Sequence, residues 1–341
     1  MSSTARTNEL PSKSLADDAQ WKTSLKKAYR DPLELLAQLK LKPDEVAIEL
    51  DAKFPCLVPR EFASKMTPGD MHDPLLRQVL PLAVEREDAA NFTDDPNEES
   101  AFMTTPGLIQ KYAHRALLIV TGGCAVNCRY CFRRNFPYQG SVGTARLNTA
   151  LAEIAESSDI SEVILSGGDP LVLDDDHLGA LIAEIAGIKH VNRLRIHTRF
   201  PIMIPSRLTP ALRDCLANTR LNIALVLHIN HGNELDADLI ARLKDFHSAG
   251  VNLLNQSVLL KGVNDDAKTL IALSEKLFEA RIIPYYLHRL DQVSGSQHYA
   301  VPLETAHALE QTLRNELPGY LVPKFVEEIP NAAAKTPLHL L

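Results

Sequence analysis

The sequence predicts an α/β fold, a partial (β/α)6 TIM-like barrel, on three observations. First, the sequence contains six short apolar runs. From the second run onward they are spaced about thirty residues apart, which is the length of a strand-plus-helix unit. They occupy 116–120, 162–165, 193–196, 222–227, 254–260 and 282–287. Second, helical patterns lie between them, an alternation typical of a parallel sheet. Third, the runs end in polar, glycine-rich residues, at the sheet edge where such folds bind ligands. Six units are two short of a closed barrel and would leave one side open.

The chain divides into four predicted parts. Residues 1–20 are rich in Ser, Thr and Asp and are expected to form a flexible N-terminus. A helical N-terminal region is expected over 21–105, with short segments such as DPLELLAQL broken by prolines. The barrel is expected over 106–290. Residues 291–341 then form a C-terminal segment.

Two barrel helices are predicted in more detail. One has an apolar face over 178–185 and ends at Gly187. Another begins at Thr209, and Cys215 lies on its apolar face. Cys215 is therefore expected to pack in the core, because free cysteine is often buried. Cys56, which has no evident partner in the sequence, is expected to be structural as well.

Composition excludes several classes of protein. The 341 residues are 45% hydrophobic and 23% charged, with a net charge of −7, which is unlike the basic surface of a nucleic-acid-binding protein. No apolar run approaches the roughly 20 residues of a membrane-spanning helix, and the N-terminus lacks the apolar middle of a secretion signal. A cytoplasmic location is predicted. In that reducing compartment, clustered cysteines indicate metal or redox ligands.

The stretch CAVNCRYC places Cys124, Cys128 and Cys131 in a loop directly after the first predicted strand. Structural zinc needs a fourth Cys or a His, and the nearest histidine, His114, lies upstream of that strand. A [4Fe–4S] cluster normally takes four cysteines, so three would leave one iron open to another ligand. A zinc site that borrows a distant histidine, or incidental cysteines, remain as alternatives.

This CxxxCxxC pattern resembles the signature of radical S-adenosylmethionine enzymes. Further stretches resemble the lysine 2,3-aminomutase family within them: ILSGGDPL, HTRFPIMIPSRLT, LHINHGNEL, NQSVLLKGVND, PYYLHRLDQVSGSQH and PGYLVPKFVEEIPNAAAKTPL. The resemblance implies that Cys124, Cys128 and Cys131 hold a [4Fe–4S] cluster whose open iron binds S-adenosylmethionine. It implies an isomerase that moves an amino group between neighbouring carbons.

The family resemblance also implies which residues bind the nucleoside cofactor. Gly167, Gly168 and Asp169 match the family's GGDP loop, near the methionine end of S-adenosylmethionine, where a carboxylate would suit an ammonium group. His228 and Gln256 match positions that line the nucleoside pocket.

A second cofactor, pyridoxal 5′-phosphate, is implied by the match of Lys335 in NAAAKTP to the family's catalytic lysine. Arg115 and Tyr112, with Lys111, match the segment that holds the phosphate. A guanidinium fork and a phenol suit phosphate oxygens.

On the substrate side, the resemblance assigns the substrate carboxylate to Arg133, and assigns the distal ammonium of lysine to Asp291 and Glu328. Two acids at that end favour lysine over glutamate, whose own carboxylate they would repel.

The chain also departs from free-lysine aminomutases of the family. Ala332–Ala334 stand in place of a glycine run, Asp266 stands where a zinc-binding cysteine is expected, and no cysteine cluster follows Lys335. Zinc is therefore not expected, and a homo-oligomer is only one option. This short form resembles a bacterial branch that makes (R)-β-lysine for elongation factor P, which implies functional links to that factor, its lysyl ligase and an electron donor. The rivals are a free-lysine or other amino-acid aminomutase and, from another class, a non-catalytic zinc-binding or scaffold protein.

Overall fold

The computed structural model describes residues 14–340, and within them the central feature is an open ten-stranded sheet whose strands follow chain order. Strands β3 to β8 are parallel. They are β3 (Arg115–Thr121), β4 (Glu162–Gly167), β5 (Arg193–Thr198), β6 (Asn222–His228), β7 (Asn252–Val258) and β8 (Ile283–His288). Each coincides with one of the six predicted runs. The predicted α/β class with a mostly parallel sheet is confirmed.

Four further strands, which the sequence did not indicate, extend the sheet at both edges. Before β3 lie β1 (Met103–Thr105) and β2 (Leu108–Tyr112), both antiparallel to their neighbours. After β8, β9 (Lys324–Glu327) pairs with it in parallel and β10 (Thr336–Pro337) pairs antiparallel with β9. These strands bring the segments around residues 111 and 328–335 to the sheet.

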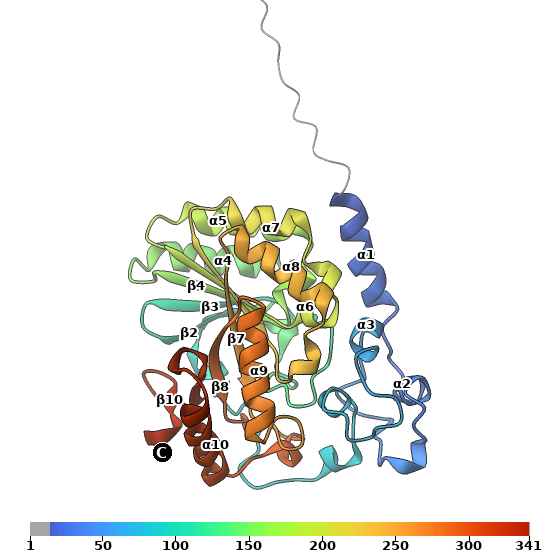
Figure 1. Cartoon of the computed structure of the whole chain (residues 1–341). Coiled ribbons are helices and arrows are strands. Elements are labelled where there is room, and N and C mark those ends of the chain that lie inside the picture. The colour runs from blue at the N-terminus through green and yellow to red at the C-terminus, as the bar shows by residue number, and fades with distance from the viewer. Residues whose placement is uncertain (1–13, 341) are drawn as a thin grey trace, which may run out of the picture.

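Helices cover the outer face of the sheet (Figure 1). They are α4 (Thr144–Glu156), α5 (Asp175–Gly187), α6 (Phe200–Met203), α7 (Pro210–Ala217), α8 (Ala237–Ser248), α9 (Ala267–Glu279) and α10 (Leu303–Glu316). As predicted, α5 ends at Gly187 and α7 is capped by Thr209, whose side chain accepts a hydrogen bond from the Leu212 amide. Cys215 packs against the core while staying partly exposed, and Cys56 is buried.

The N-terminal stretch is less helical than expected. It contains α1 (Ser14–Lys26), α2 (Pro32–Gln38) and α3 (Arg60–Ala63), and otherwise turns and short 3-10 segments. Six prolines between positions 43 and 81 explain this, because each lacks an amide donor and disfavours a helical residue before it. Part of the expected flexible N-terminus, 14–20, belongs to α1, and the rest lies outside the described residues.

The same stretch packs beside the barrel, near α6 (Figure 1). The ring of Trp21 meets that of Phe200 edge-on, with centroids 5.4 Å apart, and Phe62 is fully buried in the core shared with the barrel. The N-terminal stretch is thus part of one hydrophobic core.

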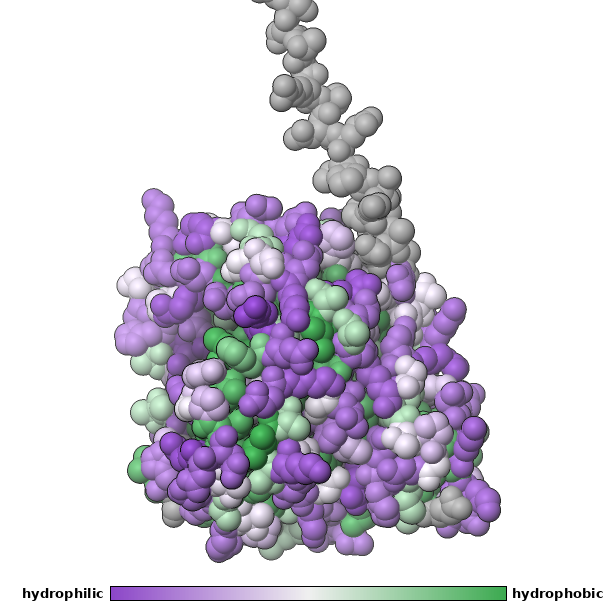
Figure 2. Space-filling model, in the orientation of Figure 1, coloured by the Kyte–Doolittle hydropathy of each residue, from purple (hydrophilic) through white to green (hydrophobic). Residues whose placement is uncertain are grey.

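The face shown in Figure 2 is mostly hydrophilic, with hydrophobic residues gathered mainly near its middle. Within residues 14–340, no helix is both long enough and apolar enough to cross a membrane.

Candidate active site

A cavity of about 450 Å³ lies at the carboxyl ends of the parallel strands, within the size range of ligand pockets. All of the site residues predicted from the sequence line it. They are Cys124, Cys128, Cys131, Gly167, Gly168, Asp169, His228, Gln256, Arg133, Lys111, Tyr112, Arg115, Asp291, Glu328 and Lys335. The fold therefore brings together residues more than 200 positions apart, although their individual roles stay predictions.

The cysteine loop follows β3 and is held from two sides. Within the loop, the Cys131 amide donates to the Cys128 carbonyl at 3.0 Å. From the N-terminal stretch, the Gln78 carbonyl accepts from the Arg129 amide at 2.9 Å. Burial raises the pKa of the Cys131 thiol to about 12 and, with the nearby Asp169 charge, raises the pKa of Cys124 well above its usual value. A bound metal centre would reverse this effect, because its positive charge favours thiolates.

The three thiols of the cysteine loop have the donor chemistry of iron–sulfur ligands. Among residues 14–340, no three or more His, Cys, Asp or Glu side chains form a group that could hold one metal ion. A [4Fe–4S] cluster makes a different demand, since each cysteine binds a separate iron and the sulfur atoms surround a larger body. Three cysteines that line one cavity meet that demand in number and in donor chemistry.

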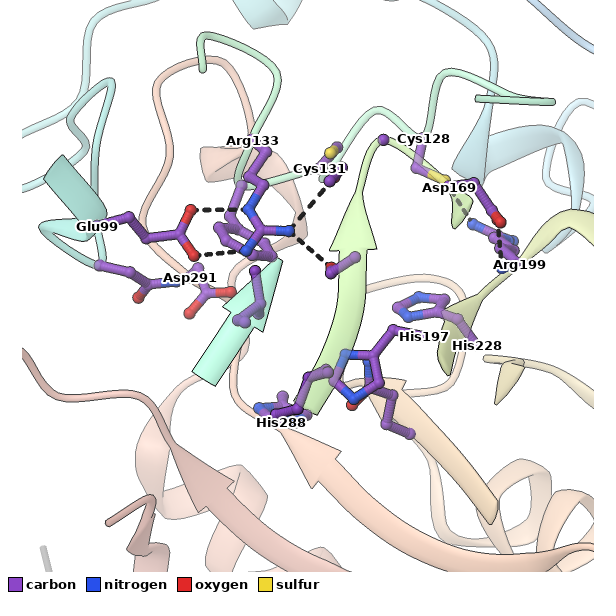
Figure 3. A pocket seen from close by; sticks show the side chains of 18 of the residues that line it. Glu99, Cys128, Cys131, Arg133, Asp169, His197, Arg199, His228, His288 and Asp291 are labelled. Atoms are coloured by element: carbon purple, nitrogen blue, oxygen red, sulfur yellow. Dashed lines mark hydrogen bonds and ion pairs between the residues drawn. The ribbon is translucent and has the colours of Figure 1, made fainter. Parts of the chain in front are cut away.

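Arg199, at the end of β5, was not singled out from the sequence, although its loop was. Its Nη1 donates to Cys128 Sγ at 2.9 Å and also contacts the Tyr130 hydroxyl. Its Nη2 donates to Gln78 Oε1 at 2.6 Å and to Glu234 Oε2 at 3.2 Å. Burial alone would lower the pKa of Arg199, but Cys128, Tyr130 and Glu234 raise it above its usual value. A fixed positive charge therefore sits beside one cysteine (Figure 3).

Both oxygens of the Asp169 carboxylate accept hydrogen bonds from neighbouring protein groups. Oδ1 accepts from Thr198 Oγ1 at 2.7 Å and the Leu171 amide at 3.0 Å, and Oδ2 accepts from the Arg199 and Phe200 amides at 2.7 and 2.8 Å. Two donors on each oxygen use the lone pairs that an ammonium would need. In this structure Asp169 ties the loops after β4 and β5 together, and its expected contact with the cofactor stays a prediction.

The two glycines before it permit close packing of the cysteine loop against β4. A Cβ on Gly168 would lie 2.1 Å from the Gly123 carbonyl oxygen, and one on Gly167, whose φ is +123°, would lie 2.4 Å from that of Thr121. Both contacts are with backbone atoms and far too short for any side chain. These glycines therefore set the distance between the GGDP loop and the cysteines.

Arg133 already holds an internal carboxylate. Its Nε and Nη2 donate to the two oxygens of Glu99 at 2.7 and 2.6 Å, a bidentate pair. Its Nη1 donates to Ser166 Oγ at 2.8 Å and to the Gly167 carbonyl at 3.3 Å. Figure 3 shows Glu99 and Arg133 facing each other at the side of the cavity where Asp291 lies. Glu99 was missed because nothing in ESAF distinguishes it from a surface acid.

Glu328, the residue directly after β9, accepts hydrogen bonds from three donors. Lys111 Nζ donates to its Oε1 at 2.6 Å, the Tyr112 hydroxyl donates to the same oxygen, and Lys335 Nζ donates to Oε2 at 2.5 Å. Burial alone would raise the pKa of Glu328, but these neighbours, Lys335 foremost, hold it below its usual value. The Lys335 amine is thus tethered at the cavity wall.

Asp291 behaves differently although it lines the same cavity. Burial raises its pKa to about 7, opposed by the positive charge of Lys335 and reinforced by the negative charge of Glu328. A cation bound beside this carboxyl group would favour its ionised form and lower its pKa.

Arg115 and Tyr112 form a stacked pair. The guanidinium carbon of Arg115 lies 4.5 Å from the centroid of the Tyr112 ring. Burial and the hydrogen bond to Glu328 raise the pKa of Tyr112, so its phenol is neutral and its proton is directed to Glu328. The guanidinium of Arg115 therefore lies over the face of a neutral phenol, and the contact of both residues with a phosphate stays a prediction.

Three histidines, of which only His228 was predicted, lie together in the cavity (Figure 3). His197, His228 and His288 end or nearly end β5, β6 and β8. Burial lowers all three pKa values; that of His228 falls to about 3, helped by the charge of Arg199. They line the cavity as neutral polar rings. His197 and His288 occur in HTRFP and LHRLD, so a histidine at a strand end was the available signal.

Comparisons with known proteins agree with this geometry. Residues 118–273 match the family model of the radical SAM superfamily. The chain is 47% identical to an L-lysine 2,3-aminomutase of Escherichia coli (strain K12), over 94% of each chain. It is 45% identical to one of Haemophilus influenzae, over 94% of this chain and 96% of that one. It is 36% identical to one of Clostridium subterminale, over 81% of this chain and 67% of that one.

Proposed function

We propose that this chain, which belongs to the L-lysine 2,3-aminomutase family of the radical SAM superfamily and is an isomerase, converts (S)-α-lysine to (R)-β-lysine. One observation carries the choice of substrate: a single cavity holds Arg133 together with the partly buried acids Asp291 and Glu328. Lysine carries a carboxylate at one end and an ammonium at the other, which matches one base and two acids. Glutamate would bring a second carboxylate to those acids and be repelled.

The family implies a [4Fe–4S] cluster and S-adenosylmethionine, and we assign the cluster to Cys124, Cys128 and Cys131. We further propose pyridoxal 5′-phosphate on Lys335, with Arg115 at its phosphate. When bound, these groups supply a radical and an electron-delocalising carrier for the migrating amino group. Three thiols, a tethered amine and a guanidinium on the wall of one cavity support the assignment, since these are the donors that such groups need.

The protein's own residues would bind and orient the substrate. Arg133 would receive the substrate carboxylate, which takes over from Glu99 as its partner. Asp291 would receive the distal ammonium, and its carboxyl would lose its proton as it does so. Glu328, the second proposed partner of the distal ammonium, holds Lys335 at the cavity wall when no cofactor or substrate is bound. Neutral His197 and His288 add no charge that would compete with these contacts.

The product is proposed to serve modification of elongation factor P in the cytoplasm, through a separate lysyl ligase. One observation supports this choice over a free-lysine pathway: Ala332–Ala334 and Asp266 depart from the pattern of the family's free-lysine enzymes.

The test is an anaerobic incubation of the purified protein with lysine, S-adenosylmethionine, pyridoxal phosphate and a reductant. We expect (R)-β-lysine by chiral mass spectrometry, and no corresponding product from glutamate or arginine. Cys128→Ala should abolish turnover, whereas the matched control Cys215→Ala, at a cysteine outside the cavity, should retain it. A colourless protein that contains zinc and makes no β-lysine would overturn the proposal.

The elongation factor P role needs its own assay. The reaction mixture is supplied to elongation factor P with a lysyl ligase and ATP, and the mass of the factor is measured. An added β-lysyl group is expected; production of β-lysine that the ligase does not accept would support a free-lysine pathway instead.

A further inference from the structure

One buried polar network reaches the cysteine loop without belonging to it. Arg199 lies at its centre, with an exposed fraction of only 6%, and its Nη1 lies 2.9 Å from Cys128 Sγ. Among the three cysteines, Cys128 is thus in direct contact with a cation. Arg133 and Arg134 are also near the loop, but they donate to Glu99, Ser166, Glu85 and backbone oxygens and to none of the thiols.

The position of Arg199 is fixed from several directions. Its Nη2 is held by Gln78 and Glu234, and its own backbone amide donates to Asp169. The ring of Tyr130 lies 5.6 Å from its guanidinium carbon. Because both ends of the residue are tied down in the interior, the N–H group cannot swing away from the sulfur without breaking buried hydrogen bonds.

Gln78 connects this network to the N-terminal stretch. Its Oε1 accepts from Arg199, Asn230 and the Tyr130 hydroxyl, and its Nε2 donates to Glu234 at 3.1 Å. Gln78 itself is fully buried. A side chain from outside the barrel therefore supplies one of the hydrogen-bond acceptors that hold the Arg199 guanidinium in place.

A hydrogen bond to a cysteine sulfur and a nearby positive charge both stabilise the reduced form of an iron–sulfur cluster, since reduction adds negative charge. We propose that Arg199 is a positioning and tuning residue for the cluster: its N–H···S contact with Cys128 raises the cluster's reduction potential and so eases its one-electron reduction. This inference rests on the proposed cluster ligands. It concerns only the electron affinity of the cluster and assigns Arg199 no contact with substrate.

The experiment compares wild type, Arg199→Met and Arg199→Lys after anaerobic reconstitution, with iron content measured first. The midpoint potential of the cluster is then obtained by a redox titration followed by electron paramagnetic resonance. Arg199→Met, which loses donor and charge, should lower the equilibrium constant for reduction at least tenfold, a shift of about 59 mV to more negative potential for one electron. Arg199→Lys, which keeps the charge, should shift the potential in the same direction by less.

Arg134→Gln is the matched control. It removes a positive charge beside the same loop but no contact with a thiol, since Arg134 donates to Glu85 and to the carbonyls of Arg129 and Gly295. Its shift should be smaller than that of Arg199→Met. A purely structural defect would admit water, which also stabilises the reduced cluster and moves the potential in the opposite direction.

The outcomes separate the two levels of inference. If wild type binds no iron, the cluster assignment fails and this inference fails with it. If wild type and Arg199→Met carry equal iron and the same potential, only this inference is overturned. If Arg199→Met loses its iron, the potential of Arg199→Lys is the test. A potential equal to that of wild type in an Arg199→Lys protein with full iron content would contradict the tuning role.

Discussion

Glu99→Ala tests whether Arg133 is built to hold a carboxylate. The pair it breaks is buried, with side-chain exposed fractions of 5% for Arg133 and 12% for Glu99, and bidentate. Without Glu99, the guanidinium keeps its contacts to Ser166 and Gly167 but has no counter-charge. The variant should therefore be less stable than wild type when no substrate is present.

The size of the effect follows from burial. Removing one partner of a buried ion pair costs about 3–5 kcal/mol, because an uncompensated charge remains. The unfolding entropy of a chain of this length, at about 2.1 cal/mol/K per residue, converts 3 kcal/mol to a fall in Tm of about 4 °C. If the substrate carboxylate takes the same place on Arg133, lysine should restore part of this loss, and a ligand at 100 times its Kd stabilises by about 2.7 kcal/mol.

The assay is differential scanning fluorimetry of both proteins with and without saturating lysine, with the cofactors present. The matched control is Asp238→Ala, which breaks a surface ion pair on α8: Arg242 Nε donates to both oxygens of Asp238 at 3.1 Å, and Asp238 is 63% exposed. An exposed pair of this kind contributes at most about 1 kcal/mol, and lysine should affect the control as it affects wild type. A Glu99→Ala protein as stable as wild type, or one that lysine stabilises no more than wild type, would refute the argument.

Two further predictions concern the cofactors and the acids. Cys128→Ala should lose both the iron signal and turnover, and an iron signal equal to that of wild type would contradict this prediction. Lys335→Ala should lose turnover and the pyridoxal absorbance but keep its iron. Because burial raises the pKa of Asp291 to about 7, its contribution to stability is complete below about pH 4 and is lost as pH rises through about 7. Thermal melts of Asp291→Asn should lack this pH dependence, whereas identical profiles would show that Asp291 does not titrate there.

The parallel strands and their helices were predictable because their signals are local. Apolar runs of strand length recur with a helix between them, and α7 begins with Thr209 as an N-cap followed by proline at its first position. The edge strands escaped prediction for the opposite reason. β10 has two residues and β9 has four, and each exists because the neighbouring strand supplies its hydrogen-bond partners. Such pairing depends on tertiary structure and leaves no period in the sequence.

The site was predictable as a set of residues but not as a set of contacts. The family resemblance named Arg133 and Asp169, and the fold places both at the cavity. It could not show that Arg133 holds Glu99, or that four donors already occupy the carboxylate of Asp169. Spacing in the sequence identifies which strand ends meet, whereas the partner of each polar group is decided by packing between distant segments.

The N-terminal stretch illustrates this limit and explains why the cavity needs it. Glu85 accepts from Arg129 Nη2 at 2.6 Å and from Arg134 Nη2 at 2.8 Å. One acid from outside the barrel thus forms ion pairs with two arginines of the cysteine loop. Glu99 neutralises Arg133 in the same way, and Gln78 completes the setting of Arg199. Without the N-terminal stretch, the four arginines would lose these partners, and burying unpaired guanidinium groups would be costly. The N-terminal stretch therefore supplies the acids and the amide that allow the cysteine loop and its neighbouring arginines to lie in the protein interior.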